Sequence, residues 1–227
     1  NLLPLEKGES ISAVIATKDF PAEEFLMFAT AQGNVKKTSM DQYDRTRRDG
    51  LIAINLKDGD ELISVKRVAQ GEKVIMVSSA GKAILWDESE ARAMGRGTMG
   101  VRGMNVPADA HVLGMEIAKP GTDLFVITEK GYGKKTPVEE YRITNRGGLG
   151  IKNYMVTEKT GGIVGVKVVD GSEDLLLVTR AGILIRTPVE AIRTTGRATQ
   201  GVIVMRFKEE GDSVISMALT EHEESEE

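Results

Sequence analysis

The stretch from Gly131 to Arg146, GYGKKTPVEEYRITNR, together with the apolar run LFVI at 124–127, decides the fold. Its pattern is a glycine that follows an apolar run, with an arginine fifteen residues after the glycine. The pattern occurs four times, with glycines at 33, 81, 131 and 182 and arginines at 48, 96, 146 and 197. The glycines, called anchor glycines below, are 48, 50 and 51 residues apart. Such intervals are typical of a repeat protein whose unit is one small sheet.

Each unit is predicted to hold four strands, because stretches rich in Val and Ile with period-two alternation indicate half-buried strands. An opening strand is expected at 11–15, 62–65, 112–117 and 163–168, and a second strand at 25–28, 74–77, 124–127 and 175–178. A return strand follows each anchor glycine, at 35–38, 83–86, 134–136 and 183–187. Glycine supplies the positive φ that a tight hairpin turn needs. A last strand is expected after Gly50, Gly100, Gly150 and Gly201, at 51–56, 101–106, 151–156 and 202–207.

Four strands in about fifty residues resemble a propeller blade, whose sheet buries its apolar face only when neighbouring blades stack on it. The predicted fold is therefore all-β and propeller-like, with repeats at about 8–58, 59–110, 111–161 and 162–212. Extra edge strands are expected at 1–7 and 213–220, as parts of a preceding and a following unit. The chain is thus expected to be a piece of a longer array, or to lend its end strands to a neighbour or to ring closure.

The composition is that of a globular domain, with 227 residues, 41% hydrophobic and 28% charged. No apolar run approaches the roughly 18 residues of a membrane helix, so a cytoplasmic location is expected. The absence of cysteine excludes disulfides, thiolate catalysis and the common zinc sites. The net charge is −4, but residues 221–227 hold five glutamates and are predicted to form a disordered acidic tail. That tail either solubilises the protein or competes for its basic surface.

The sequence motifs that resemble cofactor or catalytic sites lack the neighbouring elements that such sites need. Residues 95–100 have the glycine spacing of a dinucleotide-binding loop, but a predicted strand follows them in place of the helix that would hold the pyrophosphate. Only two histidines exist, His111 and His222, so histidine-based catalysis has no support. We predict no catalytic residue, no metal site and no cofactor in this domain.

Basic side chains at repeated positions lead to the functional prediction. If a regular rotation relates the units, equivalent residues line one curved rim, and such a band of positive charge suits the phosphates of a bent polyanion. The predicted DNA-binding residues are Lys36, Lys37, Arg45, Arg48, Lys82, Arg92, Arg96, Arg102, Lys134, Lys135, Arg142, Arg146, Lys152, Arg193 and Arg197. The alternative is that the arginines cap loops or pair with Glu90, Glu140 and Glu190.

Several motifs resemble the C-terminal domain of DNA gyrase A and its relative in topoisomerase IV. They are NLLPL at 1–5, GNVKKT at 33–38, AMG at 93–95, TMGVRG at 98–103, KGYGK at 130–134 and GRATQGV at 196–202. The resemblance covers essentially the whole chain and implies a β-pinwheel, in which neighbouring blades exchange a strand and double-stranded DNA wraps around the basic perimeter. It also implies a non-catalytic module of a bacterial, ATP-dependent type II topoisomerase. The rest of gyrase A and gyrase B would be its partners, and wrapping would direct negative supercoiling.

The resemblance has one gap. The family's basic heptapeptide, QRRGGKG, is absent, and the most similar segment is TNRGGLG at 144–150, with Leu149 in the place of the lysine. We therefore expect a fragment that lacks the first blades, binds DNA and wraps it poorly. A complete chain would instead favour kinship with topoisomerase IV. From a different class, the alternative function is a propeller scaffold that binds protein partners.

Overall fold

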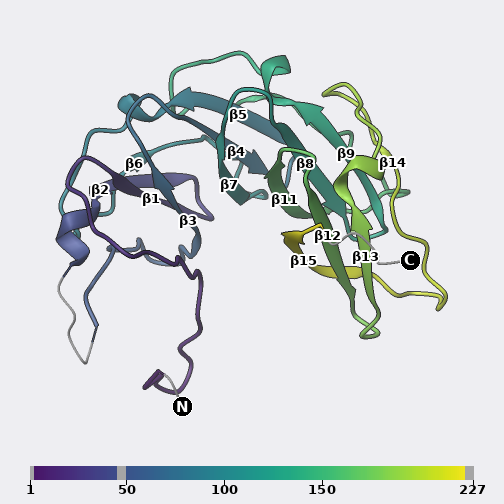
Figure 1. The fold of residues 1–227 in the computed structure, drawn as a ribbon, viewed down its shortest axis with the longest axis horizontal. Coiled ribbons are helices and arrows are strands. Elements are labelled where there is room, and N and C mark those ends of the chain that lie inside the picture. Colours follow the sequence, from purple (N-terminus) through teal and green to yellow (C-terminus); the bar gives the residue numbers. More distant parts are fainter. Residues whose placement is uncertain (1–2, 45–49, 223–227) are drawn as a thin grey trace.

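A computed structural model of the chain describes residues 3–44 and 50–222. Four small antiparallel sheets, the blades, follow one another along a curved arc (Figure 1). The predicted all-β, propeller-like fold is confirmed. No helix in the described part of the chain has the length and apolar character that crossing a membrane requires.

Strands from distant parts of the sequence make up each blade. The first blade contains β1 (Phe25–Thr30), β2 (Asn34–Ser39), β3 (Leu62–Val68) and β6 (Val101–Arg102). The second contains β4 (Lys73–Ser78), β5 (Lys82–Asp87), β7 (Val112–Ala118) and β10 (Ile151–Lys152). The third contains β8 (Asp123–Thr128), β9 (Tyr132–Pro137), β11 (Ile163–Val169) and β14 (Val202–Ile203). The fourth contains β12 (Glu173–Thr179), β13 (Leu184–Pro188) and β15 (Val214–Glu221). The 3-10 helices η1 (Met40–Tyr43), η2 (Glu88–Glu90), η3 (Val138–Glu140) and η4 (Val189–Ala191) follow the return strands.

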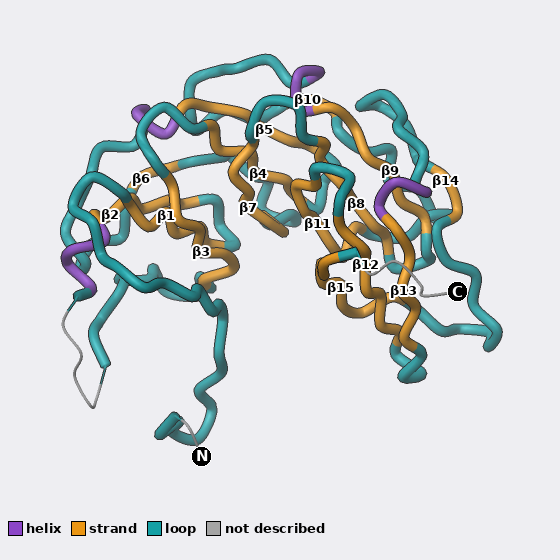
Figure 2. The backbone as a smooth tube through the Cα atoms, viewed as in Figure 1, coloured by secondary structure: helices purple, strands orange, loops and turns teal. Residues whose placement is uncertain are grey.

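In the first three blades a hairpin forms the middle of the sheet, and the strands on its two sides come from later in the chain; in the fourth blade only one such strand, β15, is present among the described residues. In the first blade the order is β3-β1-β2-β6, so β3 is the inner strand and β6 the outer strand. The inner strands β3, β7, β11 and β15 contact one another in succession along the concave side of the arc (Figure 2). Each outer strand belongs to the unit after the hairpin that it completes. This is the strand exchange that the family resemblance implies, and each blade therefore draws on two of the predicted repeats.

The hydrophobic core lies between blades. One buried cluster joins Met27 and Val35 of the first hairpin to Met76 and Trp86 of the second. Met104, from the segment after β6, belongs to the same cluster. Trp86 and Met76 are completely buried in a cluster that draws on both blades, so this core is shared between neighbouring blades.

Each anchor glycine in the first three blades lies under the outer segment of the next unit. At Gly33, φ is +90°, and an added Cβ would lie 2.1 Å from the carbonyl oxygen of Met104. The amides of Gly103 and Met104 both donate to the Gly33 carbonyl, at 2.8 and 3.1 Å. Gly81 and Gly131 have the same arrangement, with Tyr154 and Met205 above them. The hairpin tip thus needs glycine for its backbone angle and for the close approach of another chain segment.

Several predicted strands are shorter than expected or absent. The predicted last strands at 101–106, 151–156 and 202–207 are strand only over their first two residues, because the chain then crosses the hairpin tip. The segments at 11–15 and 51–56 form no strand, and neither do residues 3–7. Inner and outer strands pair with the hairpin of the preceding unit, and among the described residues no hairpin precedes β1.

The predicted strand at 213–220 is present as β15 (Val214–Glu221), and it extends into the segment predicted as tail. β15 is the inner strand of the fourth blade and pairs with β12 through Glu221. His222 Nδ1 lies 2.7 Å from Asp174 Oδ1 on β12. Residues 221 and 222, predicted as tail, therefore belong to the blade, and residues 223–227 lie outside the described part of the chain.

Two matched glycine substitutions can measure how much the close contact between an anchor glycine and the outer segment of the next unit contributes to stability. Gly131 and Gly182 both have φ +83°, but a Cβ at Gly131 would lie 2.4 Å from the Met205 oxygen, whereas one at Gly182 meets nothing within 4 Å. Both alanine variants should lose about 1–2 kcal/mol from the left-handed backbone. Gly131→Ala should lose about 1–3 kcal/mol more, from the clash. Urea unfolding checks this, and equal losses would contradict the role of the contact.

Candidate nucleic-acid interface

The loops after η2, η3 and η4 each cross the return strand of the preceding blade. Met94 N donates to Lys37 O at 2.7 Å, and Thr144 N and Thr195 N donate to Leu85 O and Lys135 O, both at 2.9 Å. Three loops therefore occupy equivalent places on the convex side of the arc (Figure 1). These loops carry most of the arginines that the sequence analysis selected.

The first arginine of each loop is exposed. Arg92, Arg142 and Arg193 are eleven residues after their anchor glycines and all reach solvent. None of the ion pairs found between described residues involves one of them. Their charges are therefore available to an external ligand.

The second arginine of each loop is half-buried and binds the protein's own backbone. Arg146 Nη1 donates to Arg102 O at 2.9 Å, Arg197 Nη1 to Lys152 O at 2.8 Å, and Arg96 Nη1 to Ile52 O at 3.5 Å. Each acceptor lies two residues after the glycine that starts the preceding outer segment. The repeated arginine therefore clamps neighbouring outer segments together. The acceptors of these guanidinium groups are main-chain carbonyls, as the capping alternative predicts.

The outer strands add exposed cations beside these clamps. Arg102 on β6 and Lys152 on β10 are exposed, and their own carbonyls accept the clamp bonds. Arg206, on the segment after β14, is a further exposed cation that the predicted site omits. The sequence could have identified Arg206, because it lies in a predicted last strand, as Arg102 and Lys152 do. Lys82 on β5 is half-buried, and Arg45 and Arg48 lie outside the described residues.

Four predicted DNA-binding lysines are buried and hold the fold together. Lys36 and Lys134 are fully buried, and their ammonium groups donate to Arg96 O and Gly196 O at 2.8 Å. Lys37 pairs with buried Glu88 at 2.6 Å, and Lys135 donates to Val189 O at 3.2 Å. Lys36 and Lys134 thus hold the arginine-bearing loops, and Lys37 and Lys135 hold the 3-10 helices η2 and η4 that precede these loops. We therefore leave all four out of the candidate interface.

Burial also changes the acidity of two of these lysines. The pKa of Lys36 and that of Lys134 are each lowered to about 8, chiefly because burial disfavours the charged form. In the other units the equivalent residues are Ile84 and Ile185. The lysines therefore alternate with apolar residues at one position of the repeat.

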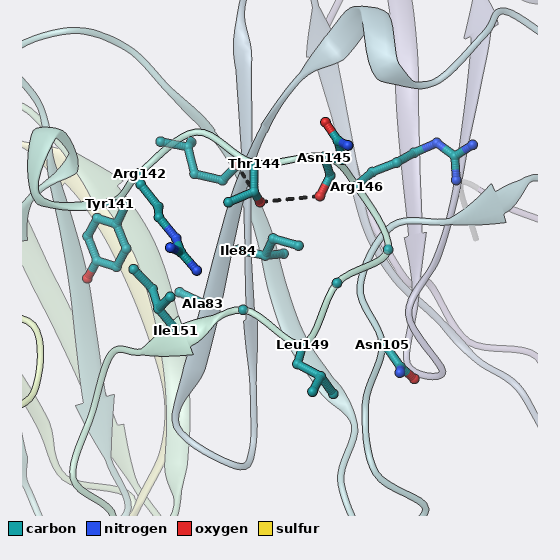
Figure 3. A pocket seen from close by; sticks show the side chains of 14 residues that line it. Ala83, Ile84, Asn105, Tyr141, Arg142, Thr144, Asn145, Arg146, Leu149 and Ile151 are labelled. Carbon is teal, nitrogen blue, oxygen red and sulfur yellow. Dashed lines mark hydrogen bonds between the residues drawn. The ribbon is translucent and has the colours of Figure 1, made fainter.

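A hollow of about 620 Å³ lies between the return strand β5 and the loop 141–150 (Figure 3). Arg142 and Arg146 leave this loop in different directions in Figure 3, with Asn105 and Asn145 nearby. No acidic side chain is among the residues that line the hollow. Two cations, amide donors and exposed glycine backbone suit an anion such as a phosphate.

Acidic residues lie next to the exposed arginines, on the 3-10 helices that precede the loops. Glu90, Glu140 and Glu190 are exposed on the 3-10 helices, two or three residues before the exposed arginines. In the part of the chain that the structure describes, no group of three or more acidic or histidine side chains is placed to hold a metal ion.

The exposed cations of the three loops and of the outer segments are called the outer basic band below. They are Arg92, Arg102, Arg142, Lys152, Arg193 and Arg206.

Four segments of the chain match the protein family described as DNA gyrase C-terminal domain, beta-propeller, at residues 24–69, 72–119, 122–170 and 173–221. Each segment contains one hairpin and the inner strand that follows it. The match covers most of the chain and follows the blades.

Similar proteins carry related names. DNA gyrase A from Staphylococcus epidermidis is 42% identical over 227 residues, which cover 99% of this chain and 25% of that protein. Its counterpart from Staphylococcus aureus is 41% identical over 210 residues, covering 91% and 24%. The chain thus spans about a quarter of the length of these curated relatives.

Two solved structures share the fold. The C-terminal domain of DNA topoisomerase IV has a TM-score of 0.88 at 27% identity, over 97% of this chain and 69% of that chain. The DNA gyrase A C-terminal domain has a TM-score of 0.85 at 27% identity, over 96% and 73%.

Two arginines of one loop should behave differently when replaced. Arg146→Ala removes bonds to Glu90 O and Arg102 O and should destabilise the fold by about 1–3 kcal/mol. Arg142→Ala removes an exposed side chain and should change stability by less than about 0.5 kcal/mol. Urea unfolding of both variants checks this. A similar stability loss in the two variants would argue against the clamp.

Stability should depend on pH through Lys134. Its pKa is about 8 when folded and near 10.5 when unfolded, so between these values the unfolded state binds more protons and stability rises with pH. Relative to Lys134→Met, which does not titrate, the wild type should gain on the order of 1 kcal/mol between pH 7 and pH 9. Urea unfolding at both pH values measures this, and a difference that stays constant would refute the lowered pKa.

Proposed function

Because this chain belongs to the family of DNA gyrase C-terminal domains, we propose that it binds duplex DNA through the phosphate backbone and bends it along the convex side of the arc. The observation that supports this most directly is the outer basic band. Arg92, Arg142 and Arg193 stand exposed at equivalent positions of three consecutive loops. A ligand that runs past several blades meets the same charge at regular intervals.

The band suits phosphates better than base edges. Its cations lie on short loops and two-residue outer strands, and the described elements of the convex side include no helix that could enter a major groove. Contacts with phosphates position a duplex without selecting its sequence. The proposed binding is therefore independent of sequence and sensitive to salt.

The curvature of the array supports bending. The loops follow the convex side of the arc (Figure 1), so a duplex that touches all of them has to follow the same curve. Bending a site of 20–30 base pairs costs about 1–6 kcal/mol, so contacts must be spread over several blades. The repeated band supplies such distributed contacts.

The proposal extends to the parent protein. We propose that it is a bacterial, cytoplasmic, ATP-dependent type II topoisomerase, in which gyrase B is a partner and this domain contributes neither catalytic residues nor a cofactor. The names of the sequence relatives favour gyrase over topoisomerase IV, whereas the two similar folds do not separate them. A protein-binding scaffold remains the alternative function, and the hollow without acidic residues beside Arg142 favours a polyanion.

Wrapping can be tested by topology. Relaxed circular DNA is sealed by a ligase in the presence of the chain, and its linking number is measured after the protein is removed. A change in linking number that grows with protein concentration supports wrapping of the duplex around the protein. Binding without a shift would leave a DNA-binding module that does not wrap, and the absence of both would favour the scaffold.

Binding should lose salt dependence when the exposed arginines are removed. Each phosphate contact contributes about 0.9 to the slope of log K against log salt, so replacing Arg92, Arg142 and Arg193 by Ala should reduce the slope by up to about 2.7. Fluorescence anisotropy with a labelled duplex at several salt concentrations measures the slope. The control replaces three exposed lysines in turns beside the inner strands, Lys57, Lys119 and Lys208. Equal slopes for the two triple variants would contradict the outer basic band.

A further inference from the structure

Two exposed apolar side chains lie among the cations of the outer basic band. Met99 and Leu149 are 48% and 53% exposed, and each stands directly before the glycine that starts an outer segment, Gly100 or Gly150. The third loop has the half-buried Gln200 at this position. Described blades lie on both sides of the loop that carries Leu149. One position of the repeat thus presents an apolar side chain to solvent in two successive units.

The main chain on both sides of these residues is fixed. Before Leu149, Gly148 O accepts a hydrogen bond from Asn105 N at 2.8 Å. After it, Gly150 lies against the return strand β5, where an added Cβ would be 2.5 Å from a carbonyl oxygen. Met99 has the equivalent contacts on its two neighbours. A side chain that projects from a fixed backbone loses little entropy when a ligand covers it, so this position is preorganised for binding.

Exposed cations stand beside each apolar residue. Arg102 and Lys152 follow Met99 and Leu149 by three residues, and Leu149 lines the same hollow as Arg142. An apolar protein surface that covered Leu149 would also take these cations out of water without giving them a partner, which is costly. A duplex offers phosphates to the cations and offers sugars and base steps to the apolar side chains. The local chemistry therefore favours DNA as the ligand.

We propose that Met99 and Leu149 enter the minor groove of the bound duplex and act as wedges that partly unstack a base step. The inference rests on the proposed function and adds to it the residues that concentrate the bend. Proteins that bend DNA often insert Leu or Met between base steps. The minor groove is about 6 Å wide, so it admits a single side chain on a loop.

The wedges divide the work of bending between two kinds of contact. Cations of the outer basic band hold the phosphates, and each wedge replaces part of a smooth bend with a local kink, at a pyrimidine–purine step where stacking yields most easily. Met99 and Leu149 occupy equivalent places in successive units, so the kinks follow the spacing of the blades. The third loop, with Gln200, contributes phosphate contacts alone.

Replacing both residues by glutamine tests the wedges. Met99→Gln combined with Leu149→Gln gives two loops the residue that the third loop already has at this position, so the fold should be kept, which urea unfolding checks. The double variant should keep the salt slope of the wild type and bind a labelled duplex about 3–10-fold more weakly. On relaxed circles sealed at saturating protein, its change in linking number per bound chain should be smaller by about a third or more.

A second measurement detects the unstacking itself. Duplexes carry 2-aminopurine at successive positions around a TA step, because the fluorescence of this base rises when its neighbours unstack. The wild type should raise the fluorescence, and the double glutamine variant should not. Met99→Leu combined with Leu149→Met keeps two apolar wedges and should behave like the wild type. Val164→Gln is the matched control, on the inner strand β11 of the concave side and 38% exposed, and it should also behave like the wild type.

The outcomes separate this inference from the function on which it rests. A double glutamine variant with the linking-number change and the 2-aminopurine signal of the wild type would overturn the wedges and leave the phosphate contacts intact. An equal loss of both signals in Val164→Gln would overturn them too, because that residue lies away from the outer basic band. A wild type that does not bind duplex DNA would instead overturn the proposed function, and the wedges with it.

Discussion

The contact between an anchor glycine and the carbonyl above it is the constraint on which the rest of the structure depends. Gly33 accepts two amides from residues 103 and 104, about seventy residues later in the chain. A hairpin completed in this way cannot finish its sheet before the next unit has formed. Because the buried cluster around Trp86 includes residues of two blades, the apolar core imposes the same order. The array is therefore stable as a series, with each unit completing the one before it.

Some basic residues support this constraint directly, and others are exposed to solvent. Lys134 is buried under the loop that carries Arg197, and Arg197 in turn holds the outer strand at Lys152. Lysine has this role in the first and third hairpins, where burial lowers its pKa, and isoleucine occupies the position in the second and fourth. One chemical type thus divides into buried and exposed sets according to its position in the repeat. Only the exposed set can act on a partner.

The sequence predicted the hairpins well because their signals are local. Apolar alternation and an anchor glycine lie within fifteen residues of each other, and the observed strands β1, β4, β8 and β12 contain the predicted ones. The outer strands were overestimated because their partners belong to another unit, and alternation alone does not reveal where a strand ends. At 51–56 the pattern is intact and the hairpin that would complete the strand is not in the described residues.

The candidate site shows the same limit. Periodicity identified Arg92, Arg142 and Arg193, which are exposed, but it equally selected Lys36 and Lys134, which are buried. Successive residues of a strand point to opposite faces of the sheet. The sequence does not show that a loop of the next unit covers the outward-pointing residues of the return strand. The structural role of the second arginine in each loop could have been predicted from its spacing. Arg146 stands four residues before Gly150, as Arg96 and Arg197 stand before Gly100 and Gly201, and a fixed distance to a structural glycine indicates a structural role.

The clamp and the proposed phosphate contacts of the arginines are linked through the geometry of the loops. Each loop of the outer basic band is bound to the return strand of one blade, and its second arginine is bound to the outer segment of the preceding unit. The spacing between exposed cations therefore depends on how the blades pack on one another. A flexible band could adapt to straight DNA, whereas a band fixed in this way favours a duplex that adopts the curve of the array. In the proposed function, bending depends on the same strand exchange that holds the fold together.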